Sequence, residues 1–254
     1  MPLKGSHIPT VWLFLDTETE ETLKGEITYH HFHVGWTCLL RRATEKRPET
    51  EAWTWFLSAG GINGYIQEIA LRYKRIQVVG HNIFFDLQAA GTFTFLAAQG
   101  WKLDFYYDRG LTYLLKCSLG EVVMTLVSST NWFDQSLRSL GKVVGLEKLD
   151  IEFGKASPEE LKTYCMRDVE ILVELFKYYF RFIQDNEMGS LGLTKASQAF
   201  KAYRFRFTDG SIFIHHHAEV HALERAAYMG GRVECFFIGH CKGGPFVSLD
   251  VNSM

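Results

Sequence analysis

Residues 11–18 read VWLFLDTE, an apolar run that ends in two acidic side chains. Five consecutive apolar residues are typical of a β-strand that is buried on both faces. Asp16 and Glu18 lie two positions apart, and side chains at that spacing project from the same face of a strand. The stretch therefore predicts a central strand that presents two carboxylates at its carboxyl end.

Two further acidic side chains close short local patterns, Asp86 in HNIFFD (81–86) and Asp168 in YCMRD (164–168). Four carboxylates cannot share a small site without cations, because like charges in contact raise one another's pKa and cost several kcal/mol. Oxygen ligands without His or Cys suit Mg²⁺ or Mn²⁺ better than Zn²⁺. A pair of such ions commonly activates water in phosphodiester cleavage. The pattern therefore predicts a site for two Mg²⁺ or Mn²⁺ ions.

The three patterns, in this order, resemble the proofreading 3′→5′ exonuclease domain of family B DNA polymerases, a DEDD exonuclease with tyrosine in its third motif. Further segments resemble the protein-primed branch of that family, found in phages and linear plasmids. These segments are SLRSL (136–140), LEKLD (146–150) with Lys148, YMGG (228–231) and SLDVNSM (248–254). The resemblance covers residues 10–254, and Asp250 would stand where the polymerase motif has one metal ligand.

The resemblance implies an α/β fold of the ribonuclease H-like type, a mixed sheet flanked by helices. Residues 1–186 would form the exonuclease domain, and residues 187–254 a connecting region with the start of the polymerase palm. Asp250 would then be a vestigial polymerase metal ligand, because the chain ends four residues after it. Polymerase activity is therefore not expected from this chain alone.

The resemblance also implies a role for each site residue. Asp16 and Glu18 would hold the ion that polarises the attacking water, Asp168 would complete its ligands, and Asp86 would reach the second ion. Tyr164 would orient the water, and Lys148 would place an ammonium near the scissile phosphate. The residues expected to grip the 3′ end of single-stranded DNA are Thr19, Asn82, Phe85, Ser136, Leu137, Tyr228, Gly230 and Gly231.

Several of these assignments have a structural alternative. Ser136 and Leu137 also suit the first turn of a helix whose apolar face is buried. Phe85 belongs to a chain with 20 phenylalanines, so it could pack in the core. Lys148 lies in a charged stretch, where a lysine is often only a solvated side chain. The histidines at 215–217 fit a solvated turn.

Composition limits the remaining possibilities. With 254 residues and 47% hydrophobic content, the chain can bury a large core. A net charge of −2 gives no basic signature, so nucleic-acid binding would depend on a local groove. Five scattered cysteines fit a reducing compartment, and no apolar run is long enough for a membrane span. A cytoplasmic protein is expected, with a terminal protein and the rest of a polymerase as further partners and no membrane.

Apolar periodicity and turn residues predict the elements along the chain. We expect residues 33–40 and 52–57 to be antiparallel neighbours of the strand at 11–15, and residues 101–127 to form a strand pair with a turn at 118–120. The helix after Ser157 has an N-cap serine, a proline and a glutamate in its first turn, and should end near Gln184. The other expected elements are helices at 61–74, 85–99, 195–207 and 219–228, a strand at 76–80, and a hairpin of 233–238 with 246–251.

Three functions are compatible with this pattern of residues. The first is a metal-dependent 3′→5′ exonuclease that acts on single-stranded DNA ends and proofreads for a family B DNA polymerase in protein-primed replication. The second is a nucleic-acid binding or scaffolding module of a replication complex, and the third is a standalone RNA exonuclease of the same superfamily. The intact carboxylates and Tyr164 favour an enzyme, because a binding module would be expected to lose one of them.

Overall fold

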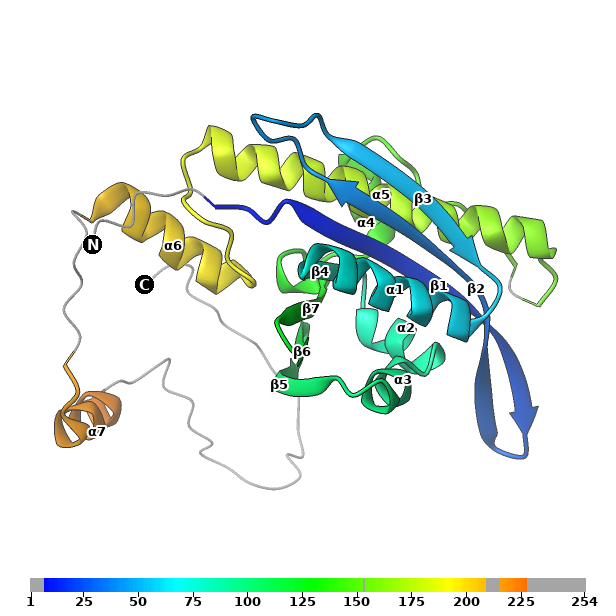
Figure 1. Cartoon of the computed structure of the whole chain (residues 1–254), viewed down its shortest axis with the longest axis horizontal. Helices are drawn as coiled ribbons and strands as arrows, with labels where there is room; N and C mark the ends of the chain where they lie inside the picture. The colour runs from blue at the N-terminus through cyan, green and yellow to red at the C-terminus, as the bar shows by residue number, and fades with distance from the viewer. Residues whose placement is uncertain (1–6, 153, 209–214, 228–254) are drawn as a thin grey trace, which may run out of the picture. The chain divides into compact units, whose positions relative to one another are not determined.

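The computed structural model describes residues 7–152, 154–208 and 215–227 (Figure 1). The chain divides into two compact units, residues 1–211 and residues 212–254. The first unit contains the sheet and most of the helices, and it is the unit in which the four carboxylates lie. The boundary expected at residue 186, between an exonuclease domain and a connecting region, stays a prediction.

Seven strands of the first unit form one sheet in the order β3-β2-β1-β4-β7-β6-β5. The strands β1, β4 and β7 run parallel to one another, and the other pairs are antiparallel. The predicted mixed sheet flanked by helices is confirmed. The strands are β1 (Val11–Lys24), β2 (Ile27–Arg41), β3 (Thr50–Phe56), β4 (Arg75–Gly80), β5 (Lys102–Arg109), β6 (Thr112–Leu119) and β7 (Val122–Ser128).

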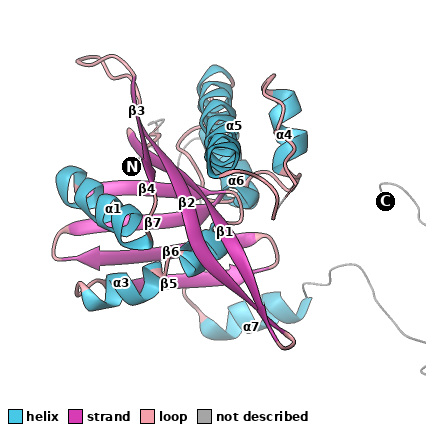
Figure 2. Ribbon diagram, turned by 90° about the vertical axis from the view of Figure 1, so that its right-hand side faces the viewer, coloured by secondary structure: helices cyan, strands magenta, loops and turns pink. Residues whose placement is uncertain are grey.

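Helices cover both faces of this sheet. Figure 2 shows α1 (Ala59–Tyr73) and α3 (Thr92–Ala98) on one side, and α4 (Leu137–Val143) and α5 (Pro158–Asp185) on the other. The short helix α2 (Ile83–Ala89) packs in the same core cluster as α1 and α3. The remaining helices are the 3-10 turn Ser129–Asn131, α6 (Lys195–Phe207) and, in the second unit, α7 (Ala218–Ala227).

Strand β1 divides its apolar side chains between the two faces, as the period of two requires. Trp12 and Phe14 contact Phe176 of α5, with ring centroids 5.7 and 5.2 Å away. Leu13 and Leu15 belong to the opposite cluster, beneath α1 and α2. Asp16 and Glu18 continue the series that begins with Trp12, so they are placed on the α5 side.

The carboxylates of β1 also lie past the end of its parallel neighbour. β1 pairs with β4 only through residues 12–14, and β4 ends at Gly80. A Cβ atom at Gly80 would lie 3.2 Å from the carbonyl oxygen of Leu15 and 3.1 Å from Ile83. Because glycine has no side chain, the turn from β4 into α2 can pass close to β1, which brings α2 to the carboxylates.

The strong helix start predicted at Ser157 is present. The Ser157 side chain accepts from the backbone N–H of Glu160, and the Glu160 side chain accepts from the backbone N–H of Ser157. This capping box satisfies two of the donors that a helix start leaves open. The helix α5 then runs for 28 residues and buries Tyr164 and Asp168.

Three expected elements were wrong in detail. The strand β3 pairs with β2 and not with β1. The helix expected at 85–99 is two helices, separated where Gly91 adopts a φ of +61°, a conformation that ends a helix. Residues 101–127 form three strands, because Gly110 as well as Gly120 makes a turn.

Two further expectations concern other parts of the chain. The hairpin expected at 233–238 and 246–251 lies outside the described residues, as do Tyr228, Gly230, Gly231 and Asp250. Among the residues that the structure describes, no helix is long and apolar enough to cross a membrane.

Candidate active site

Asp16 and Glu18 form the centre of the site. Asp16 is 9% exposed, and its Oδ2 atom is buried without a hydrogen-bond partner. Burial raises the pKa of Asp16 well above its usual range, and the charges of Asp86, Asp168 and Glu18 add to this effect. Burial, with the charge of Asp168, raises the pKa of Glu18 to about 8 although Lys148 opposes the rise.

Asp86 reaches the cluster from α2, on the other face of the sheet. Its Oδ1 atom accepts hydrogen bonds from the backbone N–H of Thr17 at 3.0 Å and from the Thr17 hydroxyl at 2.7 Å. Burial raises the pKa of Asp86 to about 7, even though the two bonds from Thr17 lower it. Thr17 thus fixes the third carboxylate against the strand that carries the first two.

Asp168 and Tyr164 lie one turn apart on α5, and both are buried. The Oδ2 atom of Asp168 pairs with the Lys148 ammonium, whereas its Oδ1 atom is buried without a partner. The ammonium also lies 4.4 Å from the centre of the Tyr164 ring. Burial raises the pKa of Asp168, although the charge and hydrogen bond of Lys148 lower it.

Lys148 comes from the loop between α4 and α5. Burial lowers its pKa, but the charge and hydrogen bond of Asp168 outweigh this effect, so its pKa is raised. The loop is anchored close by, because the backbone N–H of Leu146 donates to the carbonyl oxygen of Gly141 at 2.9 Å. Lys148 is therefore part of the carboxylate cluster and not a solvated surface lysine.

The cluster fits divalent cations bound through oxygen. Asp16 and Asp168 each carry a buried oxygen without a hydrogen bond, and Lys148 pairs directly with one of the four carboxylates, Asp168. Cys165 lies beside Asp16 and Glu18, but its Sγ donates to the carbonyl oxygen of Asp16 at 3.2 Å. Burial raises the pKa of this thiol well above its usual range. The available ligands are thus hard oxygens, which suit Mg²⁺ or Mn²⁺.

A groove of about 720 Å³ opens next to Glu18. Its lining includes Thr19, His30, Phe85, Pro158 and Leu161. Phe85 is 38% exposed, and its ring meets the edge of the His30 ring with centroids 5.4 Å apart. An exposed aromatic face in such a groove can stack on a nucleic-acid base.

Three other residues expected to grip DNA, Asn82, Ser136 and Leu137, are not among the residues that line this groove. Asn82 precedes α2 in the left-handed conformation and lines a second pocket together with Ser136. Ser136 caps α4 by accepting from the backbone N–H of Ser139. Leu137 is only 5% exposed and packs in the core, as the structural alternative predicts. Contact of these residues with DNA stays a prediction.

Three residues that contribute to the site were not predicted from the sequence. Thr17 orients Asp86, and Cys165 packs beneath the carboxylates. His30 lines the groove and contacts Phe85 and Thr19. Thr17 could have been found, since it stands between the two acidic residues. His30 could not, because it depends on the pairing of β1 with β2.

The fold and the site together define a class of protein: an α/β domain with a carboxylate cluster on its central strand β1, beyond the end of the parallel neighbour β4. Its mixed seven-stranded sheet, flanked by helices, matches part of phi29 DNA polymerase. The chain resembles phi29 DNA polymerase complexed with primer-template DNA, with a TM-score of 0.58 and 16% identity over 88% of this chain. The complex of the same polymerase with single-stranded DNA gives a TM-score of 0.57, also at 16% identity and 88% coverage. Both matches span 40% of the phi29 polymerase chain.

Residues 149–254 match the family of DNA polymerases of type B, organellar and viral. This part of the chain therefore resembles the organellar and viral type B DNA polymerases, in agreement with the resemblance drawn from its motifs. The matched range contains Tyr164 and Asp168, whereas Asp16, Glu18 and Asp86 lie before it. No curated protein sequence matches the chain significantly.

Proposed function

We propose that this chain is a metal-dependent 3′→5′ exonuclease that removes nucleotides from single-stranded DNA ends. It would be the proofreading part of a family B DNA polymerase used in protein-primed replication. The observation that carries the proposal is the meeting of four carboxylates from β1, α2 and α5 beside Tyr164 and Lys148. A ribonuclease H-like fold of the DEDD type is part of the same proposal.

In this proposal each side chain has a separate task. Asp16, Glu18, Asp86 and Asp168 would hold two Mg²⁺ or Mn²⁺ ions, which when bound lower the pKa of water and neutralise charge on the phosphate. The Tyr164 hydroxyl would orient the attacking water. The Lys148 ammonium, already held at Asp168, would stabilise the negative charge that develops on the phosphate.

The groove beside Glu18 would hold the last nucleotides of the strand. Phe85 presents an exposed ring there, and stacking on a ring tolerates any base. A groove of this kind would receive an unpaired end more readily than a base pair, because the bases of a duplex are already stacked. Preference for frayed ends is what proofreading requires.

The experiment is cleavage of end-labelled single-stranded DNA, duplex DNA and single-stranded RNA, with Mg²⁺, Mn²⁺ or EDTA. We expect stepwise shortening from the 3′ end of single-stranded DNA, with loss of activity in EDTA and in Asp16→Asn. The matched control is Asp185→Asn, an exposed carboxylate at the last residue of α5. Equal activity of Asp16→Asn and wild type would refute the site.

The same gel separates the alternatives. Faster shortening of RNA than of DNA would favour an RNA exonuclease. Binding of single-stranded DNA without cleavage in either metal would favour a binding or scaffolding module. The residual activity of Asp16→Asn identifies any contaminating nuclease.

A further inference from the structure

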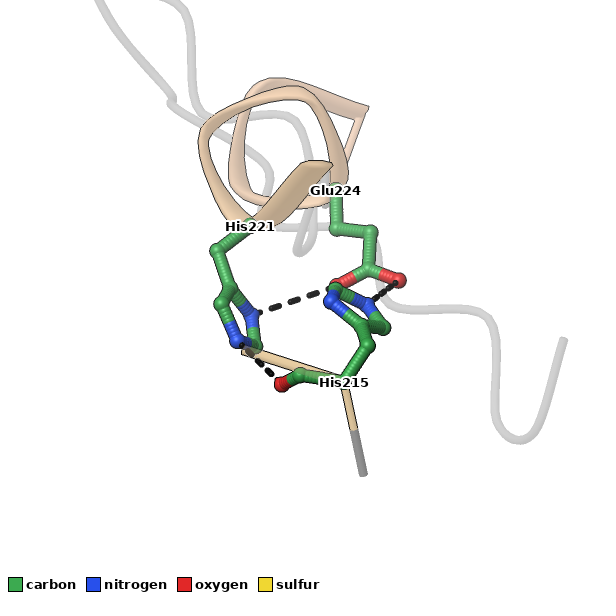
Figure 3. A group of neighbouring side chains, drawn as sticks. All are labelled: His215, His221 and Glu224. Carbon is green, nitrogen blue, oxygen red and sulfur yellow. Dashed lines mark hydrogen bonds and ion pairs between the residues drawn. The ribbon is translucent and has the colours of Figure 1, made fainter. Parts of the chain in front are cut away.

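A second group of possible metal ligands lies in the second unit. His215 precedes α7, and His221 and Glu224 lie one turn apart on it. The Nε2 atom of His215 is 3.0 Å from Oε1 of Glu224, and the Nδ1 atom of His221 is 3.5 Å from Oε2. Figure 3 shows the carboxylate facing both rings. One ligand atom from each residue lies within 4.8 Å of the others.

The hydrogen bonds fix which nitrogen of His221 carries a proton. Its Nε2 atom lies 3.0 Å from the carbonyl oxygen of His215. A carbonyl oxygen can only accept, so Nε2 is the donor, and in the neutral ring Nδ1 holds a lone pair. That lone pair faces a carboxylate oxygen. Two acceptors that face each other need a cation between them, either a second proton on the ring or a metal ion.

The ring of His215 is not held in one tautomer. Its Nε2 atom meets Glu224, and its buried Nδ1 atom makes no hydrogen bond among the described residues. No other bond therefore prevents Nε2 from presenting its lone pair to a metal ion. With a metal ion bound at Nε2, the proton of the neutral ring would sit on Nδ1.

We propose that His215, His221 and Glu224 bind a divalent transition-metal ion of the Zn²⁺ class, at a site separate from the four carboxylates. Two imidazoles and one carboxylate suit zinc and its neighbours, whereas Mg²⁺ prefers oxygen ligands. Bonds of about 2.0 to 2.1 Å in a tetrahedron place ligand atoms about 3.3 Å apart. Each histidine nitrogen already lies near that distance from one oxygen of Glu224, His215 at 3.0 Å from Oε1 and His221 at 3.5 Å from Oε2. The His221 bond to a backbone carbonyl is the usual outer support of a metal-bound histidine.

The metal would also stabilise α7. This helix has ten residues, none of them buried, and an isolated helix shorter than about 12 residues is marginal in water. The proposed ligands join the segment before the helix to its first two turns. Zn²⁺ should therefore increase the helical content of the chain as well as bind to it.

The test uses the whole chain with Mg²⁺ in excess, so that the carboxylate cluster is already occupied. Zn²⁺ affinity is measured by competition with a chromogenic chelator, Co²⁺ absorption reports the geometry, and far-ultraviolet circular dichroism reports the helix. The variants are His215→Ala, His221→Ala and Glu224→Gln. The matched control is His216→Ala, an exposed histidine next to the site and outside the cluster.

We expect one Zn²⁺ ion to bind the wild type and the control equally, with absorption typical of tetrahedral Co²⁺. Each of the three variants should bind Zn²⁺ at least about tenfold more weakly and lose the rise in helicity. The proposal is wrong if His216→Ala weakens binding as much as His221→Ala, which would indicate a non-specific histidine tract. It is also wrong if the three variants keep wild-type affinity. Every variant keeps the four carboxylates, so cleavage of DNA in Mg²⁺ tests the proposed function separately.

Discussion

Replacement of Asp86 by asparagine should stabilise the metal-free protein at neutral and alkaline pH. Asparagine keeps an oxygen that can accept both hydrogen bonds from Thr17, but it carries no charge. The folded state raises the pKa of Asp86 from 3.8 to about 7, chiefly through burial. A carboxyl group with a raised pKa binds its proton more tightly in the folded state. The wild type therefore loses stability as the pH rises from about 4 to about 7.

The size of the effect follows from this shift. One pKa unit corresponds to about 1.4 kcal/mol. The buried charge of Asp86 therefore costs about 4 kcal/mol at pH 8, whereas at pH 5 the uptake of a proton on folding costs about 2 kcal/mol. The difference in free energy of unfolding between Asp86→Asn and wild type should grow by about 2 kcal/mol between these pH values. Mg²⁺ should narrow the difference at pH 8, since an ion that binds only the folded wild type adds about 2.7 kcal/mol at 100 times its Kd.

The assay is urea denaturation in EDTA, followed by circular dichroism at several pH values. The control is Asp150→Asn, an exposed carboxylate whose pKa is lowered by its hydrogen bond and ion pair with Arg138. That variant should show no gain in stability at pH 8. A difference between Asp86→Asn and wild type that does not change with pH would refute the electrostatic interpretation of the cluster.

Four other substitutions test separate parts of the structure. Lys148→Met, which removes the ammonium held at Asp168, should slow single-turnover DNA cleavage about 10²-fold, whereas Lys142→Met on α4 should not. Phe85→Ala should weaken single-stranded DNA binding by about 1 to 3 kcal/mol in a fluorescence titration without lowering Tm, and a fall in Tm alone would make Phe85 a core residue. Asn131→Ala removes bonds to Tyr113 and to Leu193 and should cost about 2 to 4 kcal/mol in urea denaturation. Gly141→Ala places a Cβ atom 2.3 Å from the carbonyl oxygen of Leu146, so it should displace the Lys148 loop and slow cleavage. The control Gly64→Ala, in open space on α1, should stabilise by about 0.5 to 1 kcal/mol.

The central part of the fold could be predicted because local patterns determine it. The apolar run before Asp16 identifies β1, and the capping box at Ser157 identifies the start of α5. The spacing of Tyr164 and Asp168 on one helix face also follows from the sequence. These features need no information about distant residues.

The errors arose where distant pairing or a single glycine decides the structure. The long hairpin of β1 and β2 has exposed outer residues that resemble a loop, so its length was not predicted. Gly91 interrupts an otherwise helical pattern, and such a break is visible only from the backbone angle. The contact of Lys148 with Asp168 depends on how a loop folds back on α5, and residue types alone cannot give it.

The irregularity in the pairing of β1 with β2 has a mechanical consequence. Glu18 pairs with Val34, and Thr19 pairs with Phe32, so His33 is an extra residue in β2. A bulge bends a strand and increases its twist, and beyond it the hairpin projects from the sheet as an isolated ribbon (Figure 1). A two-stranded ribbon without further support is only marginally stable. A change in the bend at His33 would therefore alter the groove that His30 and Leu161 line, while Asp16 stays paired with Trp36 in the sheet.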